Sequence, residues 1–264
     1  MAKLCPLFSG SSGNSYYIEA SGSGILVDAG RSAKQIENAM RANELDIKRV
    51  QAIFVTHEHS DHIKGVRVLA SRYHIPVYSS RGTLEGMEEA GALSEKFSAD
   101  VIGWEGMEVA NMRVVPFRTP HDSRESIGFC IHTSDGRKIA IATDLGYFSQ
   151  TVFEAVSGCD IAVIESNHDV RMLQNGFYPY YLKRRILSKQ GHLSNEACAG
   201  ELPAFAQSGT TRFVLAHLSQ ENNIPELAYQ TALCSLQACG MKQGLDFELM
   251  VAPRENIGGH TILF

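Results

Sequence analysis

Histidine and aspartate side chains are concentrated in one short segment, Thr-His-Glu-His-Ser-Asp-His at residues 56–62. This segment ends a continuous apolar run of the kind found in strands buried on both faces. His57 and His59 are two residues apart and point to the same side of an extended segment, whereas Asp61 and His62 lie where a helix begins. The spacing favours two adjacent metal ions over one, and it differs from the His-Glu-x-x-His pattern of zincins.

A pair of metal ions held by imidazole and carboxylate groups would support hydrolysis. Two ions about 3.5–4 Å apart turn a bridging water into hydroxide near neutral pH and clamp the group that is attacked. The alternative interpretation is a polar loop of exposed histidines, which a lone histidine would favour. Four ligand-type residues at this spacing after a strand indicate a metal site instead.

The rest of the sequence predicts strands and helices in two comparable halves. Strands are expected at 4–8, 16–20, 25–28, 51–56, 112–118, 126–133, 138–142, 161–165, 212–216 and 247–251, among others. Ser32 predicts a helix start, and a helix over 195–207 is expected to be kinked or split at Pro203. This alternation predicts two sheets packed face to face with helices outside, in a single domain over residues 1–264.

Composition restricts the class of protein. With 264 residues, 44% hydrophobic and 20% charged, the chain is globular rather than disordered. It contains no apolar run of the ~18 residues that a membrane span needs, and its first apolar stretch is too short for a secretory signal. Its six cysteines form no Cys-x-x-Cys pair and are expected to be reduced. We therefore expect a cytoplasmic protein with no membrane partner.

The charge balance limits how an anionic substrate can be bound. The net charge of −5 provides no global basic field that would attract nucleic acid. Any anionic substrate must therefore be held by a local patch or by metal ions.

Residues 57–62 match the His-x-His-x-Asp-His signature of the metallo-β-lactamase fold, and the chain resembles that family. The resemblance implies an α/β protein, a four-layer αββα sandwich with a dinuclear site at one edge of its two sheets. It also implies three later ligands, and His121, Asp144 and His217 each follow a predicted strand. The implied ligands of the two ions are His57, His59 and His121 for one, Asp61, His62 and His217 for the other, and Asp144 for both.

The same resemblance suggests catalytic roles. Asp61 is placed to orient the hydroxide as well as to bind metal. The Gly-His-Leu-Ser segment around His192 precedes the Ala-His-Leu-Ser segment around His217, and the pair resembles the two late histidine motifs of the RNase Z group. There the earlier histidine assists proton transfer at the leaving oxygen; a surface histidine at a helix start is the alternative for His192. The polar segment 165–169 is expected to orient the ligand histidines.

Three further segments suggest a phosphodiester substrate. The small-residue loop 9–14 either forms an anion-binding nest or is a plain turn. The segment 178–185 interleaves tyrosines with three cations, which suits phosphate contacts and base stacking but also a solvated helix. Two asparagines after His217 either touch substrate or cap the next helix. The predicted substrate-binding residues are Ser11, Ser12, Asn14, Lys183, Arg184, Arg185, Asn222 and Asn223.

Taken together, these motifs resemble the small YycJ/WalJ-type proteins of the metallo-β-lactamase group, a family regarded as DNA exonuclease-like. The matching stretches are 9–14, 57–62, 165–169, 191–195 and 217–223, which span nearly the whole chain. The interval between Asp144 and His217 has no room for the large β-CASP insertion of RNA-processing relatives. The resemblance implies a dinuclear metal-dependent phosphodiesterase that acts on DNA ends.

Two other functions stay open at this stage. A thioesterase like glyoxalase II would have the same ligand set, and a metal-containing protein that binds nucleic-acid ends without catalysis would have the same fold. His59 stands where oxygen-reducing di-iron relatives carry glutamate, which favours hydrolysis over redox chemistry. The ions are expected to be zinc or manganese, with iron as an alternative, because His/Asp sites discriminate little among them. The sequence leaves the oligomeric state open.

Overall fold

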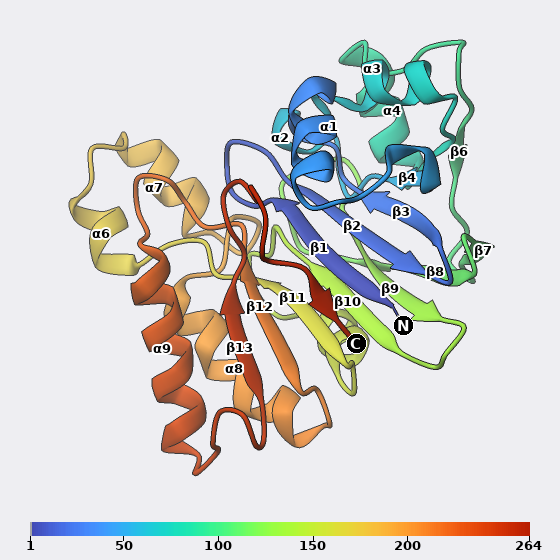
Figure 1. Cartoon of the computed structure of the whole chain (residues 1–264). Coiled ribbons are helices and arrows are strands. Elements are labelled where there is room, and N and C mark those ends of the chain that lie inside the picture. Colours follow the sequence, from blue (N-terminus) through green and yellow to red (C-terminus); the bar gives the residue numbers. More distant parts are fainter. Residues whose placement is uncertain (1) are drawn as a thin grey trace. The chain divides into compact units, whose positions relative to one another are not determined.

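The computed structural model describes residues 2–264. Its internal contacts divide the chain into two compact units, drawn with their elements in Figure 1. The first comprises residues 2–116, 123–137 and 253–264, and the second comprises 117–122 and 138–252. The single domain over 1–264 stays a prediction. Within residues 2–264, no helix combines the length and the apolar character that a membrane crossing requires.

The first unit is built on a seven-stranded mixed sheet. Its strands, in spatial order, are β14 (Ile262–Leu263), β1 (Lys3–Phe8), β2 (Ser15–Ala20), β3 (Ser23–Val27), β4 (Val50–Phe54), β5 (Val77–Ser79) and β6 (Ala99–Val101). Strands β14 to β3 pair antiparallel, and β3 to β6 pair parallel. Because parallel strands end at one edge of a sheet, the residues after β3 and β4 are brought together there.

Helices of the first unit follow from its apolar periodicity and caps. Helix α1 (Ala33–Ala42) begins, as predicted, after Ser32, whose side chain forms a capping box with Gln35. Its buried face contacts β1 and α3 (Val66–Tyr73). The remaining elements of this unit are α2 (Ser60–Ile63), α4 (Arg81–Glu89), the 3-10 turn η1 (Ile47–Arg49), β7 (Met107–Val109), β9 (Ile127–Thr133) and most of β8 (Met112–Arg118).

The second unit contains a parallel sheet, in which strands β13, β12, β11 and β10 are neighbours in that order. Their bounds are Lys138–Ala142 for β10, Ile161–Glu165 for β11, Arg212–Ala216 for β12 and Glu248–Val251 for β13. Every residue of β11 is buried, as its apolar run predicted. Helix α5 (Gln150–Val156) packs on β10, and α9 (Pro225–Ala238) packs on β13 and on α8 (Asn195–Gln207).

Helix α8 runs unbroken through Pro203, so the expected split of this helix is wrong. A proline at position 203 cannot donate to the carbonyl oxygen of Ala199, four residues earlier. That oxygen instead accepts a hydrogen bond of 2.7 Å from the Ser235 hydroxyl of α9. A tertiary contact thus replaces the missing helical bond.

Two short helices, α6 (Val170–Asn175) and α7 (Tyr180–Ile186), follow β11. Figure 1 shows them as a yellow pair set apart from strands β10 to β13. They are joined by the Lys183 ammonium group, which donates to the backbone oxygens of Gln174 and Gly176 at 2.8 and 2.7 Å. The linker between the two helices is therefore tied to α7.

Candidate metal centre

A buried carboxylate holds His62 in place at the end of β3 and β4. Asp28 is fully buried, and one of its oxygens accepts a hydrogen bond from the backbone of Thr56 at 2.8 Å. Its other oxygen accepts from Nδ1 of His62, also at 2.8 Å. This contact fixes the tautomer of His62 and leaves the lone pair at Nε2, the arrangement that metal-binding histidines usually have.

Sequence analysis did not single out Asp28. The available signal was a carboxylate directly after a buried strand, at a backbone position with φ of +61°. Its contact with His62 depends on the parallel pairing of β3 with β4, which sets Val27 opposite Phe54.

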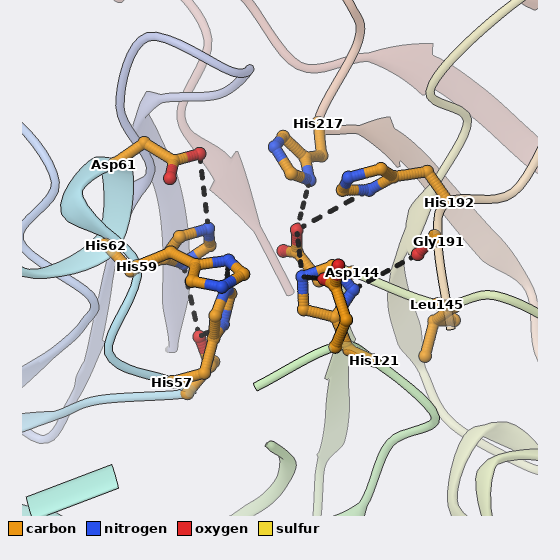
Figure 2. A network of polar contacts seen from close by, with 12 residues as sticks. His57, His59, Asp61, His62, His121, Asp144, Leu145, Gly191, His192 and His217 are labelled. Carbon is orange, nitrogen blue, oxygen red and sulfur yellow. Dashed lines mark hydrogen bonds and ion pairs between the residues drawn. The ribbon is translucent and has the colours of Figure 1, made fainter. Parts of the chain in front are cut away.

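The four ligand-type residues of the 57–62 segment lie together in the first unit. Nε2 of His57 is 3.1 Å from Nδ1 of His59, and the rings of His57 and His62 are 4.0 Å apart between centroids. Oδ2 of Asp61 is 3.6 Å from Nε2 of His62 (Figure 2). Two nitrogens that bind one zinc ion at about 2.0–2.1 Å lie roughly 3.3 Å apart in tetrahedral geometry. The spacing of His57 and His59 therefore fits a shared divalent ion.

The loop between β1 and β2 has two kinds of residue. Ser11 and Ser12 are exposed at its tip, whereas Asn14 is fully buried. The Asn14 amide accepts from the backbone of Gly10 at 3.0 Å, and its nitrogen lies 3.1 Å from Nε2 of His62. Asn14 thus positions the loop against His62, while the two serines are open to a ligand.

Arg31 is a second residue that sequence analysis missed. Its guanidinium carbon is 5.4 Å from the centre of the Phe8 ring, and a Cβ on Gly13 would lie only 2.5 Å from its Cδ. Its Nε atom is buried and has no hydrogen-bond partner among residues 2–264. Glycine at position 13 therefore makes room for a positive charge beside the serine loop.

In the second unit, three polar residues lie at the carboxyl ends of parallel strands. Glu165 is the last residue of β11, His217 directly follows β12, and Asp144 is two residues beyond β10. Asp144 and His217 have φ values of +61° and +55°, a backbone region that residues other than glycine rarely adopt. Such strain persists only where the surrounding fold maintains it, and it is typical of functional sites.

Asp144 is the centre of this second cluster. Its Oδ1 is 3.0 Å from Nδ1 of His217, 3.6 Å from Nδ1 of His192 and 3.8 Å from Nε2 of His121 (Figure 2). Ligand atoms of Asp144, Glu165, His192 and His217 all lie within 4.8 Å of one another, close enough to hold a metal ion.

His121 is held with its Nε2 directed at Asp144. Its Nδ1 lies 3.1 Å from the backbone oxygen of Gly191, to which it donates. Burial lowers the pKa of His121, although nearby carboxylates act in the opposite direction. The ring is therefore neutral near pH 7, the form that binds metal ions.

Glu165 holds His192 through a short contact. Its Oε1 is 2.7 Å from Nδ1 of His192, and its Oε2 accepts from the backbone of Leu145 at 2.6 Å and of Leu193 at 3.2 Å. Burial raises the pKa of Glu165, but the neighbouring His192 and hydrogen bonds from His192 and His217 outweigh it, so the pKa is lowered. Glu165 is thus an ionised, fixed carboxylate.

His192 is 15% exposed and lies among the other imidazoles rather than on a solvated surface. Its ring centre is 5.0 Å from that of His121 and 5.3 Å from that of His217. This position favours the proton-transfer role over the surface histidine that sequence analysis left as the alternative.

The residues of segment 165–169, which was expected to orient the ligand histidines, make different kinds of contact. The Asp169 side chain caps α6 by accepting from the backbone of Met172 at 2.7 Å, and the Asn167 side chain donates to the backbone oxygen of His217 at 2.9 Å. His168 is buried, and neither ring nitrogen has a hydrogen-bond partner among residues 2–264. Burial lowers its pKa to about 4, so this histidine is neutral.

The predicted cations of α7 differ in what they contact. Lys183 ties α7 to the preceding linker, and Arg185 pairs with Asp122, next to His121. Arg184 is exposed, with its guanidinium carbon 5.9 Å from the centre of the Tyr180 ring. Arg184 is therefore the member of the three that is most open to a ligand.

The two asparagines after His217 also differ. The Asn223 side chain donates to the backbone of Ser166 and Asn167 and accepts from the backbone of Ile224, all within 3.0 Å. Asn222 is 1% exposed, but its side-chain nitrogen has no partner among residues 2–264. Asn223 thus joins loops, and Asn222 offers a donor.

Comparison with known proteins agrees with this geometry. Residues 24–218 match the model of the β-lactamase superfamily domain. The chain is 40% identical over 246 residues to exodeoxyribonuclease YycJ of Bacillus anthracis, covering 92% of each chain, and 38% identical over 250 residues to exodeoxyribonuclease WalJ of Streptococcus pneumoniae, covering 94% and 93%.

A solved structure supports the same fold. The metallo-β-lactamase fold protein YhfI of Bacillus subtilis matches with a TM-score of 0.71 and 13% identity, over 96% of this chain and 97% of that one. The predicted fold class and the resemblance that the motifs indicated are confirmed. The chain belongs to the metallo-β-lactamase superfamily and, within it, to the group of YycJ and WalJ.

Proposed function

We propose that the protein is a cytoplasmic, dinuclear metal-dependent phosphodiesterase that degrades DNA from its ends. The observation that carries this proposal is the 40% identity, over 92% of both chains, to a protein named as an exodeoxyribonuclease. The His/Asp clusters of both units supply donor groups suited to divalent ions.

The donor set fits two divalent ions, for which we propose zinc or manganese. Neutral imidazoles and carboxylates suit both metals. When bound, such ions supply a hydroxide nucleophile and neutralise charge on the attacked phosphate. The proposed ligands are His57, His59, Asp61, His62, His121, Asp144 and His217.

The residues around the ligands have separate tasks. The Asp28 carboxylate and the backbone oxygen of Gly191 accept hydrogen bonds from Nδ1 of His62 and of His121, so each ring presents its Nε2. We assign Asp61 to orienting the nucleophile as well as to ligation. Glu165 fixes the His192 ring through Nδ1, which leaves Nε2 to give a proton to the leaving oxygen of DNA.

Substrate contacts are proposed at the serine loop and at α7. Ser11 and Ser12 are exposed hydroxyls beside the Arg31 charge. Arg184 is an exposed cation of α7, and Asn222 offers a buried amide. Four further residues contribute to substrate binding indirectly, because they hold these segments in place: Lys183, Arg185, Asn14 and Asn223.

The test of the function is the topology of DNA that the enzyme degrades. Linear DNA is labelled at the 5′ end in one substrate and at the 3′ end in another. In the presence of zinc or manganese, we expect one of the two to release labelled nucleotides. Covalently closed circles should stay intact. Turnover of a glutathione thioester with no cleavage of bis(p-nitrophenyl) phosphate would indicate a thioesterase. Binding of DNA ends without any turnover would indicate the non-catalytic alternative, and efficient nicking of circles would contradict exonuclease action.

Replacing Arg184 by glutamine should weaken DNA binding and flatten its salt dependence. One lost phosphate contact reduces the slope of log affinity against log salt by about 0.7–0.9. The slope is obtained from binding titrations at several salt concentrations. Replacing Lys183, Arg184 and Arg185 together should flatten it at least as much while hydrolysis of bis(p-nitrophenyl) phosphate survives.

The matched control is Lys242→Gln, which removes one positive charge near the amino end of β13, where no site is proposed. Its slope should equal that of the wild type. An unchanged slope in both the Arg184 and the triple variant would count against α7 as a DNA-binding element.

A further inference from the structure

A pocket of about 630 Å³ lies beside the linker between α6 and α7. Met172, Phe177 and Tyr178 line one part of it, and Glu221 and Asn222 line another. Its volume is within the ~300–1,000 Å³ range of pockets that bind small organic groups. The walls combine aromatic surface with amide and carboxylate groups, which is the chemistry that recognises a flat heterocycle.

Phe177 presents an unusual amount of apolar surface. Its side chain is fully exposed, and Tyr180 and Tyr181 are also about three-quarters exposed. The linker that carries it is not loose, because Lys183 donates to the backbone oxygen of the adjacent Gly176. Phe177 is therefore an aromatic side chain that is open to water on an anchored linker, and such side chains in nucleic-acid-binding proteins stack on unpaired bases.

Asn222 supplies an independent observation. Its backbone is fixed on both sides, since its nitrogen donates to the Ser219 hydroxyl at 3.2 Å and its oxygen accepts from Asp169 at 2.9 Å. The side-chain nitrogen is buried without a partner among residues 2–264. A Cβ at Gly176 would lie 2.7 Å from the Asn222 Oδ1, so glycine there leaves room for this amide. A buried donor without an acceptor is costly unless a ligand satisfies it.

The pocket is made by segments that start at the candidate metal centre of the same unit. Asn222 lies five residues after His217 at the end of β12, and α6 begins after Asp169, four residues beyond Glu165 at the end of β11. A nucleotide whose phosphate is bound by residues at these strand ends would have its base near the pocket, because the loops that line the pocket begin at the same strand ends.

We propose that this pocket binds an unpaired nucleobase at the DNA end, with Phe177 stacking on its face and the Asn222 amide donating to an acceptor on its edge. The carboxylate of Glu221 is available to accept from an exocyclic amino group. This inference rests on the proposed function. A base inside the duplex has both faces covered and cannot stack on Phe177. We therefore expect the enzyme to prefer DNA with single-stranded or frayed ends.

The test compares two short single-stranded oligonucleotides, one with a terminal base and one with a terminal abasic residue, both with a phosphorothioate at the last linkage to slow cleavage. In the wild type, loss of the base should raise Kd by about 5- to 150-fold, the range measured for one stacked base. Phe177→Ala should lose most of this difference, and Phe177→Trp should restore it. Asn222→Ala should reduce it.

Leu245→Ala is the matched control, since Leu245 is an exposed apolar side chain at another surface of the unit, and it should retain the full difference. If the wild type degrades DNA but Phe177→Ala still distinguishes the two probes fully, the base pocket is wrong while the proposed function stands. If the wild type does not degrade DNA under any metal condition, the proposed function itself fails.

Discussion

Replacement of Asp144 by alanine is expected to remove most of the bound metal and to reduce hydrolysis about a thousandfold or more, because each metal contributes several kcal/mol of transition-state stabilisation. In the structure the Asp144 carboxylate is the common neighbour of His121, His192 and His217. We propose that this carboxylate binds both ions, so its loss would leave neither ion with its full set of ligands. Elemental analysis after reconstitution and dialysis should give about two ions per wild-type chain. The variant should contain fewer, because we expect the occupancy of both sites to fall.

The control for this variant is Asp100→Ala, an exposed aspartate of β6, which should keep both metal content and activity. A wild-type stoichiometry fixed at one ion, together with an Asp144→Ala variant that retains it, would exclude the dinuclear centre.

Replacement of His192 by alanine should leave both metal ions bound while DNA hydrolysis falls by about 10²–10⁴-fold, the usual contribution of a general acid. The reason is that the alkoxide leaving group of DNA needs a proton, and Glu165 fixes His192 for this transfer. Because p-nitrophenolate leaves without protonation, the same variant should lose much less activity on bis(p-nitrophenyl) phosphate. Rates on both substrates and metal content measure this.

Glu165→Gln serves as the companion variant, because Glu165 contacts His192 directly and we propose that it positions this ring. This variant should also lose more activity on DNA than on bis(p-nitrophenyl) phosphate, but both losses should be smaller than in His192→Ala. Parallel loss of metal from His192→Ala, or equal losses on the two substrates, would show that His192 is a ligand rather than a proton donor.

The motifs and apolar runs of the chain were enough to indicate the family and most of the elements that carry the site. The first ligand-type residue of each motif stands one to three residues after a strand. Both patterns are local, because the strand is visible as an apolar run and the ligand as a polar residue shortly after it. Strand β11 and helix α8 accordingly have the predicted bounds. The short strands β6, β7 and β14 were not predicted, since three or fewer residues carry no period.

The contacts of the individual polar side chains could not be predicted, because they depend on how distant segments pack. Asp28 and His62 are 34 residues apart, and their hydrogen bond exists because β3 and β4 pair in one register. Lys183 and Arg184 are adjacent and alike in charge, yet Lys183 donates to the backbone oxygens of Gln174 and Gly176 while Arg184 is exposed. Charge and residue type are properties of the chain, but a hydrogen-bond partner depends on which segments folding brings within about 3 Å.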